Sequence, residues 1–213
     1  MLRVAFRAVA FLVALSIHEL AHGFVSAKLG DPTPRWARRL SLNPLAHLDP
    51  VGTLVFIVTS ITAPVTGFAI GWAKPVPVDP RYYRDPRRGL ALVGLAGPGA
   101  NLLLGLLFGL PFQLGLLSLR RAVMVPWSLE AFLLLNLATN VGLAVFNLLP
   151  LPPLDGSKVL GGLLPYRHLG WLRQLESYGP FLLLLLLFTG IADLFLMPLF
   201  RFFLGLALGG YLW

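Results

Sequence analysis

Long apolar runs separated by short polar loops dominate this chain. Such runs cover about residues 4–28, 90–119 and 130–149, and each has the roughly 20 residues that an α-helix needs to cross the hydrocarbon core of a bilayer. A fourth apolar region, about 179–213, is broken at Pro198, which predicts two short crossing segments or one span followed by an interfacial helix. The pattern predicts an all-α, multi-pass membrane protein.

The apolar block 51–72 has a different character, because Pro64, Gly67 and Gly71 interrupt it and it runs into the stretch Lys74-Pro75-Val76-Pro77-Val78. Helix-breaking residues at these positions fit a re-entrant helix followed by an extended or hairpin element at least as well as a straight spanning helix. Both topologies therefore stay open at this point, with five to six spanning helices in total.

The composition supports the membrane assignment. Of the 213 residues, 57% are hydrophobic and 12% are charged, against about 25% charged residues in an ordinary soluble domain. The formal net charge of +8 comes from basic residues at the ends of apolar segments, which indicates lipid headgroups rather than nucleic acid as partners. The loops are too short to bury a core of their own, so residues 1–213 are expected to form a single integral-membrane domain.

A metal-site pattern lies inside the first apolar run. His18 and His22 are four residues apart and therefore share one face of a helix, where two imidazoles can bind one Zn²⁺. Glu19 follows the first histidine, in the position from which a carboxylate takes a proton from water at the metal in H-E-x-x-H hydrolases. Because three such polar groups are costly in hydrocarbon, the pattern predicts a metal site. The chain has no cysteine, so the remaining ligands must be histidine or carboxylate.

Further polar groups occur at breaks in the other apolar runs. Asn101 follows a Gly-Pro-Gly sequence inside a predicted span, where a kinked packing helix and a direct contact with the site are equally good interpretations. Asp155 follows three prolines and by itself is as well explained as a helix N-cap. His47 and Asp49 are possible additional ligands, but turn formation and headgroup contact explain them more simply.

Taken together, these motifs resemble those of the site-2 protease family, the membrane-embedded zinc metalloproteases that cut transmembrane helices of other proteins. The resemblance rests on four elements in a specific order, which are His18 to His22, Gly71 to Val78, Gly97 to Asn101, and Asn147 to Gly156. These elements cover most of residues 8 to 160.

The resemblance implies that Asp155 is the third ligand of one Zn²⁺ per chain and that Glu19 is the general base. It also implies that Asn147 contacts the substrate backbone or the oxyanion, and it makes Asn101 a candidate substrate-binding residue. The segment that contains Trp72 and Lys74 resembles the family's re-entrant β-hairpin, which receives an unwound substrate by strand addition. Transmembrane-helix proteins are the implied substrates.

The remaining implications concern the extent of the domain. The catalytic core is expected at about residues 4–160, with accessory helices at about 179–213. Neither a PDZ nor a CBS domain is recognisable, so the chain resembles a minimal form. A non-catalytic metal-binding membrane protein, or an inactive protease-like scaffold, is the alternative.

Ligand placement and charge both favour the re-entrant topology. If block 51–72 spans, Asp155 reaches the opposite face from His22, whereas a re-entrant block brings the two together. The re-entrant arrangement also leaves only four basic residues on one side, and this stronger asymmetry predicts an outside N-terminus and a cell-membrane protein with its site toward the cytoplasm. Those four residues are Arg3, Arg7, Arg120 and Arg121.

Overall fold

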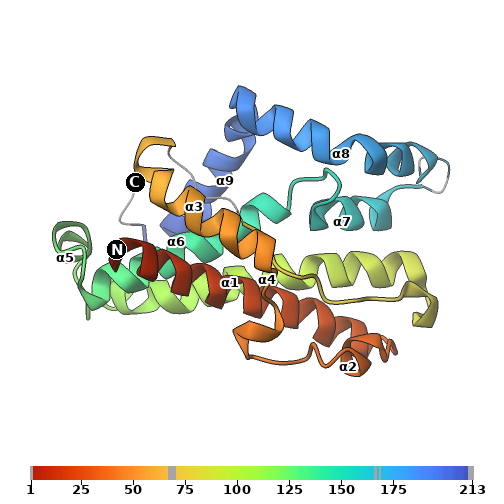
Figure 1. The fold of residues 1–213 in the computed structure, drawn as a ribbon, viewed down its shortest axis with the longest axis horizontal. Coiled ribbons are helices and arrows are strands. Elements are labelled where there is room, and N and C mark those ends of the chain that lie inside the picture. Colours follow the sequence, from red (N-terminus) through yellow and green to blue (C-terminus); the bar gives the residue numbers. More distant parts are fainter. Residues whose placement is uncertain (1, 67–70, 166, 168, 211–213) are drawn as a thin grey trace.

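A computed structural model describes residues 2–66, 71–165, 167 and 169–210. It is built from helices packed around a central group of three (Figure 1). No β-strand occurs in these ranges, where a single isolated bridge joins Leu48 to Ala73. The helices are α1 (Leu2–Lys28), α2 (Thr33–Trp36), η1 (Pro44–Ala46), α3 (Pro50–Thr66), η2 (Pro80–Tyr82), α4 (Pro86–Gln113), α5 (Leu119–Met124), α6 (Leu129–Asn147), α7 (Asp155–Leu163), α8 (Leu169–Thr189) and α9 (Asp193–Ala207).

The central group consists of α1, α4 and α6, which lie side by side (Figure 1). In the described ranges, these three helices are long and apolar enough to cross a membrane on their own, and they coincide with the three uninterrupted apolar runs of the sequence. A fourth candidate span is the pair α8 and α9, which is bent by 78°. The all-helical class is confirmed, whereas the predicted five to six spans and the β-hairpin are not.

Local sequence explains where the central helices begin and end. The side chain of Asp85 accepts hydrogen bonds from the backbone N–H groups of Arg87 and Arg88 and so caps α4, while Ser128 caps α6 through Ala131 N–H. Such caps satisfy donors that have no partner within the helix. Beyond the end of α1, Gly30 adopts φ +104°, which favours glycine.

One face of α4 is lined by small residues, which lets its neighbours approach closely. Gly94, Gly97, Gly105 and Gly109 are spaced so that they fall on the same side of the helix, and all four are buried. A methyl group added to Gly105 would lie 3.1 Å from Val141 of α6. Small residues at helix interfaces are the usual means of close packing in membrane bundles.

The chain between α1 and α4 leaves and returns at the same end of α1. The backbone N–H of Asp79 donates to the carboxylate of Asp31 over 2.8 Å, and the Leu48 to Ala73 bridge joins two intermediate points of the same excursion. Between them, α3 packs against α1 through the stacked rings of Phe56 and Phe11. The excursion therefore produces no net displacement along α1, although Gly67 and its neighbours up to residue 70 lie outside the described residues.

An apolar core forms at the end of the bundle where α4 finishes. Its buried members come from α4, α6, the region of α5, and α9 with the residue that follows it, and they are Phe112, Ala122, Leu137, Val141, Val145, Ala207 and Leu208. This core fixes the crossing of α4 over α6 and so holds the opposite half of α4 in place.

The C-terminal helices begin earlier than the apolar pattern indicates. The apolar region starts at Gly179, but α8 begins at Leu169 and passes through Gly179 and Pro180 without a break. At Gly179 there is no room for a side chain, because the backbone of Pro152 lies directly against it. This glycine is therefore a packing contact with the loop before α7, not a helix terminus.

Candidate metal centre

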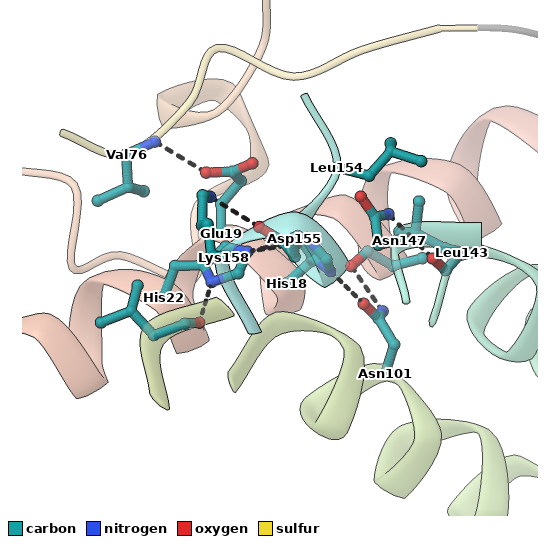
Figure 2. A network of polar contacts seen from close by, with 12 residues as sticks. His18, Glu19, His22, Val76, Asn101, Leu143, Asn147, Leu154, Asp155 and Lys158 are labelled. Atoms are coloured by element: carbon teal, nitrogen blue, oxygen red, sulfur yellow. Dashed lines mark hydrogen bonds and ion pairs between the residues drawn. The ribbon is translucent and has the colours of Figure 1, made fainter. Parts of the chain in front are cut away.

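Two helices bring three potential ligands together. His18 and His22 project from one face of α1, and Asp155 is the first residue of α7 (Figure 2). Oδ2 of Asp155 lies 3.0 Å from Nε2 of His18 and 3.0 Å from Nε2 of His22, and the two Nε2 atoms are also 3.0 Å apart. All three side chains are buried.

The outer ring nitrogens determine which way each imidazole faces. Nδ1 of His22 lies 2.6 Å from the backbone carbonyl oxygen of Val93 on α4, which can only accept a hydrogen bond. Nδ1 of His18 lies 2.7 Å from the side-chain oxygen Oδ1 of Asn101, also an acceptor. Both histidines therefore carry a proton on Nδ1, and in the neutral form of each ring Nε2 then presents a lone pair.

The residues present fit a divalent cation. Two Nε2 atoms and one carboxylate oxygen converge within 3.0 Å of one another in a buried site. These three electron-rich atoms repel one another unless a positive charge lies among them. Two histidines and one carboxylate are a donor set that suits zinc and leave an open position, as in catalytic zinc sites. In the described part of the chain, this is the one such group of potential metal ligands.

Asp155 lies beside the two histidines and does not cap α7. The N-cap position of α7 is Leu154, and no side chain makes a capping hydrogen bond there, so the N-cap interpretation is wrong. The other carboxylate oxygen, Oδ1, accepts a hydrogen bond from the ammonium group of Lys158 over 2.8 Å.

Gly97 of α4 forms the surface against which both imidazoles pack. A methyl group on this residue would lie 2.5 Å from Nε2 of His22 and 2.6 Å from Cε1 of His18. These distances are too short for van der Waals contact, so only glycine leaves space for the two rings at this position. The Gly-Pro-Gly sequence of α4 therefore contributes directly to the shape of the site.

Glu19 lies beside the three ligands but is not one of them. Its carboxylate is half-buried and accepts a hydrogen bond of 2.8 Å from the backbone N–H of Val76, on the extended segment that crosses α1 here (Figure 2). The side chain of Val76 is buried against Gly23 of α1. The segment that follows α3 is thereby attached to the residue expected to act as a base.

The other predicted site residues differ in how near they lie to the ligands. Asn101 is in direct contact with His18, which favours the site interpretation over a helix kink alone. Asn147 donates to the Leu143 carbonyl of its own helix. Trp72 and Lys74 are exposed on the extended segment, and the roles of these last three residues in substrate binding stay predictions.

The minor candidate ligands are used elsewhere. Nε2 of His47 lies 2.8 Å from the carbonyl oxygen of Ser41, and Asp49 accepts the backbone N–H of Gly52. Both therefore stabilise the turns before α3, as the simpler interpretation of these residues predicts.

Several contacts at the site have little or no sequence signal. The Val93 carbonyl and the Val76 N–H are backbone groups, which every residue carries. Lys158 has a partial signal, since it lies three residues after Asp155 in a helix and residues at this spacing are neighbours. Asn140 is visible in the sequence as a polar residue in a span, but its contact with Asn101 depends on how α6 packs on α4.

Comparison with known proteins identifies relatives in three bacterial species. The chain is 37% identical over 192 residues to a Bacillus subtilis protein named "Putative zinc metalloprotease YwhC", covering 90% of this chain and 84% of that one. It is 33% identical to "Putative zinc metalloprotease Rip2" of Mycolicibacterium smegmatis, covering 84% of this chain and 65% of the relative. The Rip2 protein of Mycobacterium tuberculosis is 31% identical over 159 residues, which are 70% of this chain and 54% of the relative. No protein-family model and no solved structure matches the chain.

Proposed function

Since the chain belongs to a family of zinc metalloproteases, we propose that it is an intramembrane protease of the site-2 type. It would hydrolyse peptide bonds within or near the transmembrane helices of other membrane proteins. The observation that carries this proposal is the group of His18, His22 and Asp155, whose donor atoms lie 3.0 Å from one another beside helices apolar enough to cross a bilayer.

A zinc ion held by these three residues would polarise the carbonyl of the peptide bond and make water a nucleophile near neutral pH. Glu19 supplies the proton transfer. Its carboxylate accepts a proton from the attacking water and delivers it to the amide nitrogen, which leaves as an amine. Because Glu19 is not one of the three converging ligands, its substitution is expected to remove turnover and leave zinc in place.

The extended segment near Glu19 supports binding of an unwound substrate. Pro75 and Pro77 have no backbone N–H, while the N–H of Lys74 is donated to His47 and that of Val76 to Glu19. These backbone donors are therefore absent or already used, so an extended peptide laid along this segment would donate its own N–H groups to the segment's carbonyl oxygens. Substrate amides within a helix are shielded by their own hydrogen bonds, so we expect cleavage near helix-breaking residues such as Gly, Pro or Asn.

The proposed location is the cell membrane, with the site toward the cytoplasmic side. The excursion between α1 and α4 begins and ends at one end of α1, where the N–H of Asp79 meets Asp31. The excursion therefore makes no net crossing, which is what the stronger charge asymmetry requires. A reporter domain fused after Trp72 is expected on the cytoplasmic side, and its appearance outside would contradict the topology.

Zinc content and cleavage, measured together, test the proposal. Wild type and Glu19→Gln, purified in detergent, should each contain about one zinc, and Asp155→Ala should lose it. Glu19→Gln should cleave a single-pass reporter with a central Asn-Pro about 10²- to 10⁴-fold more slowly than wild type. Glu130→Gln is the matched control, since Glu130 is buried and pairs with Arg121.

The outcomes separate the alternatives. Full zinc in Asp155→Ala would contradict the third ligand. Zinc in wild type without cleavage of any helix-broken reporter would favour a non-catalytic metal-binding protein or an inactive scaffold.

A further inference from the structure

Buried asparagines of α6 lead from the centre of the bundle toward the metal site. Asn136 and Asn140 are one helical turn apart, and neither has any exposed surface. In an apolar bundle, a buried amide is costly unless its polar atoms are paired. Asn140 makes no contact with the three ligands, but it contacts Asn101, which touches His18.

The hydrogen bonds of these residues run in one direction. Nδ2 of Asn140 donates to the backbone carbonyl of Asn136 over 2.9 Å, which leaves Oδ1 of Asn140 as an acceptor. Oδ1 then accepts from Nδ2 of Asn101 over 2.7 Å. Nδ2 of Asn101 also donates to the carbonyl of Ala14 over 2.9 Å. The amide nitrogen of Asn101 is thus fully used, and its oxygen must face Nδ1 of His18.

The orientation of Asn101 decides which nitrogen of His18 is available to a metal. With the amide oxygen facing Nδ1, the ring carries its proton there and Nε2 is free. With the amide turned over, an N–H would face Nδ1, and the proton would move to Nε2, where it blocks a metal. Two acceptors oppose this rotation, the carbonyl oxygen of Ala14 and the amide oxygen of Asn140, because a turned amide would place the oxygen of Asn101 against both. Of these two, only the Asn140 oxygen belongs to a side chain.

We propose that Asn140 is a positioning residue for the metal centre, which acts through Asn101 to hold His18 in its metal-binding form. The inference rests on the proposed function, since it concerns the same metal centre. It differs from a role in helix packing alone, because packing requires only that the volume at position 140 is filled. The positioning role requires a hydrogen-bond acceptor at that position.

Asn136 offers a matched control. Its side chain is as buried as that of Asn140, and its amide donates to the Phe132 carbonyl of its own helix. Its contribution to Asn140 comes from the backbone carbonyl, which Asn136→Leu preserves. Asn140→Leu and Asn136→Leu therefore remove equal polar groups one turn apart, but only the first removes the acceptor for Asn101.

The test measures metal binding in detergent-purified full-length protein. Zinc affinity is obtained by competition with a chelator, and the visible absorption of bound Co²⁺ reports on the ligand geometry. Asn140→Leu should weaken zinc binding about 10- to 100-fold and alter the Co²⁺ spectrum. Asn136→Leu should stay within about threefold of wild type, as should Asn140→Asp, which keeps an acceptor for Asn101.

Each result is decisive. Equal zinc affinity and equal Co²⁺ spectra in Asn140→Leu and wild type would overturn the inference, as would equal weakening in Asn136→Leu. If wild type and Asn136→Leu both bind no zinc, the proposed metal centre itself is wrong. If Asn140→Leu does not fold, as judged by its thermal transition, Asn140→Ala replaces it, because alanine also lacks the acceptor.

Discussion

Along α4, the half that ends at Asn101 and the half that follows it differ in what they face. Both carry glycines at helical spacing, and both bring a partner into close contact. In the first half, Gly97 faces the two imidazoles of α1. In the second half, Gly109 faces the backbone of Ala207, next to the apolar core.

This difference shows that one helix can pack closely against a neighbouring backbone in one half and make room for candidate metal-binding side chains in the other. The same small-residue face provides room for polar rings at one end and for a neighbouring backbone at the other. The second half of α4 packs in the apolar core, and the first half lies against the two histidines of the candidate metal centre. Substitutions in the two halves should therefore affect different measured properties.

The largest effect is expected from Gly97→Ala. The added methyl would overlap the rings of both His18 and His22, so zinc affinity should fall by roughly tenfold or more. The measurement is zinc content after dialysis against a weak chelator. Gly99→Ala is the control, because a methyl at Gly99 has no neighbour within 4 Å, and it should retain full zinc. Full zinc in Gly97→Ala would show that the rings do not need this space.

Gly109→Ala should show the opposite pattern. Its methyl would collide with the backbone of Ala207, and overpacking of this kind costs about 1–3 kcal/mol. Thermal unfolding in detergent should therefore occur at a lower temperature than in wild type, while zinc content stays at the wild-type value. Loss of zinc together with stability would show that the two halves are coupled.

A smaller, pH-dependent effect is expected at Asp31, beyond the membrane-spanning part of α1. Burial raises the pKa of this carboxyl. Hydrogen bonds from the Ser26 hydroxyl and from the backbone N–H groups of Asp79 and Thr33 lower the pKa by more than burial raises it, so it lies below its usual 3.8. Because the folded-state pKa is lowered, the ionised side chain stabilises the fold above pH 3.8, and this contribution is lost as the pH falls through the folded-state value.

Asp31→Asn should therefore be about 1–3 kcal/mol less stable than wild type at pH 7. The difference between the two proteins should narrow as the pH falls below 3.8. Thermal unfolding of both proteins across this range is the measurement. A difference that stays constant with pH would mean that the charge of Asp31 does not contribute.

The sequence predicts the parts of this molecule that depend on periodicity. Apolar runs locate α1, α4 and α6, and the four-residue spacing places His18 and His22 on one face. Asp155 is different, since the residues alone leave an N-cap equally good and only the family resemblance indicates a ligand. The contacts of Val93 and Val76 involve backbone atoms, so they depend on distances between helices that no local pattern encodes.

The hydrogen bond between Asp79 and Asp31 has a consequence for how this architecture can vary. Because the two ends of the intervening chain meet, its length is not set by the separation of α1 from α4. Each doubling of such a closed loop costs only about 0.6 kcal/mol of chain entropy. Insertions and deletions between residue 31 and the segment 72–78, which contacts Glu19 through Val76, can therefore accumulate without moving the histidines relative to Gly97. That stretch is the natural place for diversification or for grafting a foreign segment.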